Sequence, residues 1–370
     1  MRRVARQVGD AAERSKDLVS LWSEVTDALC AVVPGVWDTC WYTVDPASLL
    51  VTSHFRRGRA DVPAELLEEL MIHEHYGDDV NRIADLCRTA SGMGGIHEAT
   101  GGDVRASTRW RRSLAVGSDQ ELRVSLRTGP DETWGALSLY REAVRPPFDA
   151  DARAVLRRIA PVVAHAVRRM LLPSAPEAGA AGTANRAADE GGPGLVLLDR
   201  DFTVRSASPG IEHRLRRFPG HDPGGAGLPA AVVAVAAATL RAVDRGEDAV
   251  RAPYARVVAA DGGRFALYGT HVPGSGKADG IADGNADGVA VIIEQASPGR
   301  MLPLLLSAYE LTDRERDVVR LILRGRSTAQ IAAGLSVTPH TVQQHLKSVF
   351  AKTGVRSRRD LVGILLSEPY

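Results

Sequence analysis

The sequence predicts a chain of several domains, in which two α+β domains precede a small all-α domain of four helices. Its length of 370 residues is enough for two or three domains. A stretch of small, polar and helix-breaking residues at 174–193 separates two segments that both contain strand-like runs. After residue 310 the apolar residues follow helical spacing. We therefore expect a first domain at 1–173, a flexible linker at 174–193, a second domain at 194–297, a connector at 298–310 and a helical domain at 311–370.

The first domain is expected to fold as an antiparallel sheet with helices. An amphipathic helix opens it and is expected to bury Leu18, Leu21, Trp22, Val25 and Leu29, and a long amphipathic helix at 149–172 closes it. Between them, strand-like runs at 40–45, 49–55, 121–128 and 133–141 surround a helix at 63–75. The segment resembles a GAF domain, a fold that senses small molecules. The resemblance lies in Trp134-Gly135-Ala136-Leu137, Tyr140-Arg141, Phe148 and the terminal helix.

The second domain opens with two short strands that meet at Asp199-Arg200-Asp201. A helix is expected near Ser208 and a hydrophobic helix at 230–244, followed by strands at 252–260, 264–272 and 289–295. The low-complexity stretch at 274–288 is expected to be a long hairpin loop between the last two strands. The order of elements and the opening LLDRDFTVRSAS (197–208) resemble a PAS domain.

The last domain is read as four helices with clear start and stop signals. Thr312 and Glu315 form a capping box at the start of the first helix, and Gly325 ends it. The second begins at Ser327 or Thr328, and the third has Thr338 as its N-cap and runs to about Lys352. A fourth follows Arg358. Two short helices joined by a tight turn, the second with a polar outer face, indicate a helix-turn-helix.

Positive charge is concentrated on this domain. The stretch from Arg324 to Arg359 contains five arginines and two lysines but no Asp or Glu, so its formal charge is +7, while the whole chain carries +1. Such a patch attracts a polyanion and releases its condensed counterions. Double-stranded DNA is therefore the expected partner.

The same stretch is similar to the LuxR-type helix-turn-helix family. The matching residues are Leu311-Thr312, Arg314-Glu315, Gly325, Ser327, Ile331-Ala332, Leu335, Thr341-Val342, His345, Lys352 and Gly354-Val355. The resemblance implies that the third helix reads bases in the major groove with Gln343, Gln344 and Lys347. Phosphate contacts are expected from Ser327, Thr328, Thr341, Lys352, Arg356 and Arg358. His345 is interpreted as a packing residue.

Together these features predict a sequence-specific transcriptional regulator, controlled by a small ligand or a protein partner that acts on the front domains. A homodimer is expected because one small domain recognises only a short half-site. The helix at 149–172 and the connector are candidate dimer surfaces, although each could equally cover its own domain. Promoter or operator DNA and an unknown small-molecule effector are the expected partners, and a regulator of this kind can also contact RNA polymerase.

The alternative hypothesis is a haem-binding, redox-sensing or enzyme-like front module with secondary DNA binding. Cys40, Trp41, His54 and Cys87 could line such a pocket, but sensor domains commonly hold these residue types as core. We find no catalytic set and expect no cofactor and no metal. The calcium-loop pattern from Asp283 to Glu294 lacks flanking helices. His73 and His75 would point to different faces of a helix, which favours a solvated surface.

The composition of the chain limits the class of protein further. Hydrophobic residues make up 44% and charged residues 25% of the chain, as in ordinary globular domains. No apolar run approaches the ~18 residues of a membrane span, and the basic N-terminus lacks the apolar core of a secretory signal. Three widely spaced cysteines, Cys30, Cys40 and Cys87, fit reduced thiols. These observations predict a cytoplasmic protein with no membrane partner.

Overall fold

The computed structural model describes residues 2–59, 62–130, 132–171, 192–220, 227–247, 252–274 and 287–366. They form two compact units. The first unit comprises the described residues up to Met170 and from residue 192 to Gln295, and the second comprises Leu171 and the described residues from Ala296 onward. The predicted linker at 174–193 and the predicted loop at 274–288 lie almost wholly outside the described residues, as do Asp283 and Asn285 of the calcium-loop pattern.

The first sheet is five-stranded and antiparallel, with the order β2-β1-β5-β4-β3. Its strands are β1 (Asp38–Val44), β2 (Val51–Gly58), β3 (Met93–Gly95), β4 (Ser118–Gly129) and β5 (Glu132–Glu142). The pairs β1–β2 and β4–β5 confirm the two predicted antiparallel pairs. Gly135 is required where β5 passes β1, because a Cβ there would lie 2.2 Å from the carbonyl oxygen of Tyr42.

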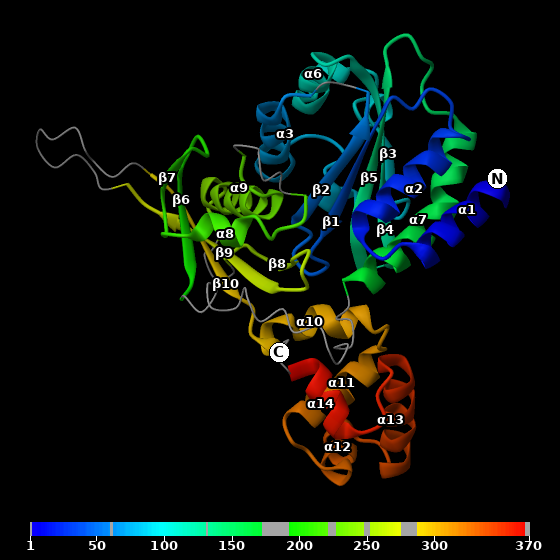
Figure 1. The fold of residues 1–370 in the computed structure, drawn as a ribbon, viewed down its shortest axis with the longest axis vertical. Helices are drawn as coiled ribbons and strands as arrows, with labels where there is room; N and C mark the ends of the chain where they lie inside the picture. The colour runs from blue at the N-terminus through cyan, green and yellow to red at the C-terminus, as the bar shows by residue number, and fades with distance from the viewer. Residues whose placement is uncertain are drawn as a thin grey trace, which may run out of the picture. The chain divides into compact units, whose positions relative to one another are not determined.

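Helices cover both faces of this sheet (Figure 1). On one face lie α1 (Arg2–Arg14), α2 (Leu18–Cys30) and the long α7 (Ala150–Met170). The other face carries α3 (Ala64–Tyr76) and α6 (Thr108–Leu114). Three short helical segments, α4 (Ile83–Leu86), α5 (Ile96–Ala99) and a 3-10 turn at Val104–Ala106, join them. Because α7 packs on β4, β5 and α1, much of its apolar surface covers its own sheet.

The core on the α2 side is built on aromatic residues. Trp41 of β1 is fully buried and stacks on Trp22 of α2, with ring centroids 4.7 Å apart. The indole nitrogen of Trp41 donates to Thr26, 2.8 Å away, so the buried polar edge is satisfied. This packing fixes which residues of β1 face the opposite side, because successive side chains of a strand alternate.

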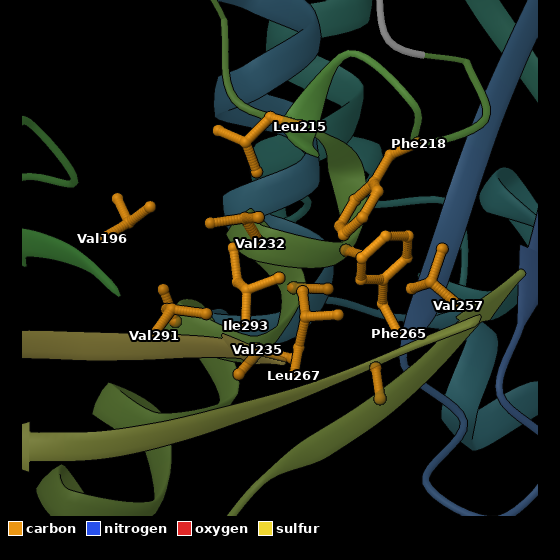
Figure 2. Close-up of a cluster of buried hydrophobic side chains, with 14 of the residues drawn as sticks. Val196, Leu215, Phe218, Val232, Val235, Val257, Phe265, Leu267, Val291 and Ile293 are labelled. Carbon is orange, nitrogen blue, oxygen red and sulfur yellow. The ribbon is translucent and has the colours of Figure 1, made fainter. Parts of the chain in front are cut away.

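The second sheet is also five-stranded and antiparallel, with the order β7-β6-β10-β9-β8. Its elements are β6 (Gly194–Asp199), β7 (Val204–Ala207), α8 (Ile211–Leu215), α9 (Ala230–Asp244), β8 (Tyr254–Val258), β9 (Arg264–Val272) and β10 (Gly288–Gln295). Figure 2 shows the apolar cluster between the sheet and its helices, where Val232 and Val235 of α9 meet Phe265, Leu267 and other strand residues. Two α+β regions with antiparallel sheets are thus confirmed.

The two sheets share one compact unit, joined largely through α9. This helix packs against α3 and β2 of the first sheet as well as β9 and β10 of the second. Arg256 of β8 binds Asp45, at the end of β1, through two side-chain bonds of 2.8 and 2.6 Å, and both side chains are almost fully buried. Arg241 of α9 donates to the carbonyl oxygen of Tyr76 at the end of α3.

The second unit contains five helices among the described residues, and each predicted helix is present. These are α10 (Pro298–Ala308), α11 (Asp313–Leu323), α12 (Thr328–Leu335), α13 (Pro339–Thr353) and α14 (Arg358–Leu366). The connector therefore begins as a helix, α10, which packs on α14. In the whole described part of the chain, no helix is both long and apolar enough to cross a membrane.

Candidate nucleic-acid interface

The helix α13 has one buried face and one solvent face. Val342, Leu346 and Val349 are buried against α11 and α12. Gln343, Gln344 and Lys347, the expected base readers, are all exposed. Gln344 bonds His340 one turn earlier, with nitrogen atoms 3.0 Å apart. No described residue bonds the side chain of Gln343 or Lys347, so both polar groups can accept an external partner.

Local signals in the sequence set the orientation of α13. Thr338 caps its N-terminus by accepting from the backbone N–H of Thr341, 3.1 Å away, and Pro339 follows at the first helical position. Ser336 has a left-handed backbone with φ 55° at the end of α12, which makes the turn between α12 and α13 tight. Gly354, with φ 72°, ends α13 in the conformation that glycine adopts most easily.

The helix α11 is tied to α13 by a polar cluster around Glu315. Glu315 closes the predicted capping box with Thr312. It also accepts from the ammonium group of Lys352 and from the hydroxyl of Ser348, each 2.6 Å away. Burial alone would raise the pKa of Glu315, but the bonds from Lys352, Ser348 and the Thr312 N–H lower it to about 2. The carboxylate therefore stays ionised and holds the two helices together.

This cluster gives Lys352 a role that its position in the family motif does not reveal. Its ammonium group donates to Glu315 and also to the carbonyl oxygen of Glu310, 3.0 Å away. A phosphate contact by Lys352 would thus have to share or replace these bonds. The sequence offered no signal for the pairing, since Glu315 and Lys352 lie 37 residues apart.

The other expected phosphate contacts surround α12 and the start of α13. Arg358 donates to Thr328 at 3.2 Å and to the carbonyl oxygen of Arg326. Ser327 caps α12 within a capping box that Gln330 completes. Arg356 is exposed, and no described residue bonds its guanidinium group. The backbone N–H groups at the starts of α12 and α13 add partial positive charge nearby.

In the first unit, a pocket lies between the sheet and α3 with α6. Cys40 and His54 line it, together with Tyr42, Tyr140 and Arg123. Trp41 is on the opposite side of β1, stacked on Trp22, and Cys87 lies in the same apolar cluster as Cys40 but does not line the pocket. The structure therefore brings together only two of the four residues considered for a haem or redox pocket.

The environment of the pocket makes its thiol unreactive. Burial, reinforced by Asp38, raises the pKa of Cys40 to about 12, so the thiol remains protonated at neutral pH. Burial also lowers the pKa of His54 to about 4, so the imidazole is neutral. Within the described ranges, no three His, Cys, Asp or Glu residues come close enough to hold a metal ion.

The expectation of a solvated surface at His73 and His75 is wrong for His75. His75 is only 6% exposed, while the His73 side chain is 30% exposed and near Glu69. The Nε2 atom of His75 has no hydrogen-bond partner among the described residues. Burial lowers its pKa to about 4. The charges of Arg82, Arg123 and Arg241 act in the same direction, and Arg241 belongs to α9. The period of α3 could not reveal this, because the covering helix comes from a distant part of the sequence.

The pattern of apolar residues also did not reveal the charged network beside the pocket. Glu121 and Arg123 alternate with Leu122 and Val124 along β4, and all four are buried. An alternation of polar and apolar residues normally indicates a strand with one solvent-exposed face, but here helices cover both faces of the sheet (Figure 1). Two successive polar positions of β4 carry charged side chains, the carboxylate of Glu121 and the guanidinium of Arg123. This pattern is the sequence signal that could have indicated buried ion pairs.

The arrangement of α11 to α14, with its cationic surface and exposed polar helix face, defines a helix-turn-helix DNA-binding domain. Residues 309–365 match the family model of the bacterial regulatory proteins of the luxR family. An HTH-type transcriptional regulator of Mycobacterium bovis is 56% identical over 52 residues, which is 14% of this chain and 6% of that protein. A regulator of Mycobacterium tuberculosis matches to the same extent. The C-terminal segment is thus a LuxR-type helix-turn-helix domain, and the match spans only a small part of these relatives.

Solved structures resemble the chain more weakly. Escherichia coli SdiA is 10% identical, covers 97% of this chain and 94% of its own, and gives a TM-score of 0.33. The LuxR-family factor CepR2 of Burkholderia cenocepacia, described as N-acylhomoserine lactone dependent, is 17% identical with a TM-score of 0.32. It covers 44% of this chain and 90% of its own. These TM-scores do not establish a shared fold for the first unit.

Proposed function

We propose that the protein is a sequence-specific DNA-binding transcriptional regulator in which α13 enters the major groove. The observation that carries this proposal is the solvent face of α13. It presents Gln343 and Lys347, whose polar groups are bonded by no described residue, on a helix fixed by a buried apolar face. A glutamine amide can bond the N6 and N7 atoms of adenine, and a lysine ammonium can reach O6 and N7 of guanine.

The surrounding groups are suited to hold the DNA backbone. Arg356 offers a guanidinium group that no residue of the described part of the chain bonds, while Ser327, Thr328 and Thr341 lie at helix N-termini where N–H groups favour anions. Arg358 and Lys352 add charge next to these groups, although each is already bonded within the domain. We assign these six residues to phosphate contacts and Gln343, Gln344 and Lys347 to base contacts.

We further propose that the first unit is a regulatory region with GAF-like and PAS-like parts, and that the chain acts on DNA as a homodimer. A single small domain recognises a short half-site, so a second copy would supply the rest of the specificity. A pocket between sheet and helices in the first unit supports control by a small ligand. The effect on transcription would follow from contacts with RNA polymerase at the bound promoter.

The test is selection of duplexes from a random pool with the full chain, followed by affinity measurements on the selected site. Gln343→Ala should weaken binding to that site about 5- to 150-fold, as expected for the loss of 1–3 kcal/mol of base discrimination. It should leave binding to unrelated DNA almost unchanged. Arg320→Ala is the matched control, because Arg320 is exposed on α11 and paired with Asp317. A Gln343→Ala variant that keeps the wild-type ratio of affinities for the selected and the unrelated sites would contradict the assignment of α13.

A further inference from the structure

The pocket of the first unit is unusual in that its charges are already neutralised by one another. Arg123 of β4 donates to Glu74 of α3 at 2.6 Å and lies 2.6 Å from Glu121. Arg109 of α6 binds the same Glu121 at 3.0 Å. All four side chains are less than a tenth exposed, and they form a chain of two cations and two anions with no net charge. Arg56 and Asp38, which also line the pocket, form a further pair that is again neutral.

The charged groups of this network also form further hydrogen bonds. Glu74 also accepts the backbone N–H of Ile83, and Arg123 also donates to Ser138 at 3.0 Å. Burial alone would raise the pKa of Glu74, but Arg123 and Arg109 lower it, so the carboxylate stays ionised. An incoming carboxylate or ammonium group would have to break one of these buried pairs. Leaving a buried charge without its partner is strongly unfavourable.

The uncharged polar groups of the pocket, in contrast, are available. His54 is neutral, stacks on Tyr42 with ring centroids 5.2 Å apart, and no described residue bonds its ring nitrogens. Ser113 and Ser118 line the same pocket, and no described residue bonds their hydroxyls. A neutral imidazole offers one donor and one acceptor, and each hydroxyl offers both. The opposite wall is apolar, made by Leu67, Leu70 and Met71 of α3.

We infer that this pocket binds a small uncharged molecule that places an apolar group on α3 and a hydroxyl or carbonyl group toward His54 and the two serines. The inference rests on the proposed regulation only for its biological role, since binding itself requires no DNA. The helix α3 that forms the apolar wall also packs on α9 of the second sheet. A molecule in the pocket therefore contacts α3, which is the helix of the first sheet that packs most extensively on the elements of the second sheet.

The experiment compares three probes of nearly the same shape on the full-length protein: benzyl alcohol, benzoate and benzylamine. Saturation-transfer NMR and calorimetric titration measure their binding without DNA. Benzyl alcohol should bind saturably and at least about tenfold more tightly than benzoate or benzylammonium, since a charged probe must disrupt a buried pair. Tighter or equal binding of either charged probe would overturn the assignment of an uncharged ligand.

Two variants locate the binding. Leu70→Trp fills the apolar side of the pocket and should abolish saturable binding, while Leu114→Trp, on the exposed surface of α6, should leave it unchanged. His54→Phe keeps a ring stacked on Tyr42 but removes the hydrogen bonds, so benzyl alcohol should bind about 3- to 10-fold more weakly. If both pocket variants bind benzyl alcohol as the wild type does, or if the wild type shows no saturable binding, the pocket is not the site. Failure of DNA binding would leave these results intact and would count only against the proposed function.

Discussion

Charged side chains are used in opposite ways by the pocket of the first unit and the surface of the helix-turn-helix domain. At the pocket, Glu74, Arg123 and Arg109 of its lining and the adjacent Glu121 are buried and bonded to one another. On the helical domain, seven cations lie within 36 residues that contain no acid, and Lys347 and Arg356 have no bonded partner among the described residues. Paired buried charges fix a shape and reject ions, whereas unpaired exposed charges attract a polyanion.

The largest effect is expected where a buried pair joins the two sheets of the first unit. Arg256→Ala would leave Asp45 buried without its partner, so the free energy of unfolding should fall by about 3–5 kcal/mol. Urea unfolding of the full chain, followed by tryptophan fluorescence, measures this loss. The exposed pair Arg14–Glu24, with the same kind of contact at 2.8 Å, is the control. Arg14→Ala should change little, because solvent screens exposed pairs.

Equal losses from Arg256→Ala and Arg14→Ala would show that burial does not distinguish these pairs. A loss below about 1 kcal/mol for Arg256→Ala would mean that the contact between the two sheets does not depend on it.

A smaller, pH-dependent effect is expected at His75. Its pKa is lowered from 6.5 to about 4 in the folded protein, so the unfolded chain binds more protons between these values. Stability should therefore fall as the pH drops below 6.5, by about 2 kcal/mol from His75 at pH 5. His75→Phe should remove this part of the pH dependence in urea unfolding between pH 7 and 5.

His73→Phe is the matched control, two residues away on the same helix but half-buried. It should retain the pH dependence of the wild type. If His75→Phe loses stability with acid as steeply as His73→Phe does, His75 is not the buried neutral group that the packing of α9 on α3 indicates.

The local signals in the sequence predicted much of the structure, because they depend on neighbours in the chain. The capping box of Thr312 and Glu315, the cap at Thr338 and the inward face of α13 are all present. The paired strands of both sheets followed from alternation and turn residues. These features require only periodicity and capping chemistry within a few residues.

What escaped prediction depends on contacts between distant parts of the chain. Asp45 and Arg256 are 211 residues apart, and nothing local marks either as buried. The burial of His75 follows from α9, and the second role of Lys352 follows from Glu315. Periodicity indicates that a face is covered but not which segment covers it, so the joining of the two sheets could not be inferred.

The most direct test of the central claim is the salt dependence of DNA binding by the full chain, measured by fluorescence anisotropy on its selected site. The logarithm of the affinity should fall linearly with the logarithm of salt concentration, and Arg356→Ala should reduce the slope by about 1 per domain bound. Arg320→Ala should leave the slope as in the wild type, since Arg320 already has a partner in Asp317. An Arg356→Ala slope that equals that of the wild type would contradict the account of unpaired cations as the DNA-binding surface.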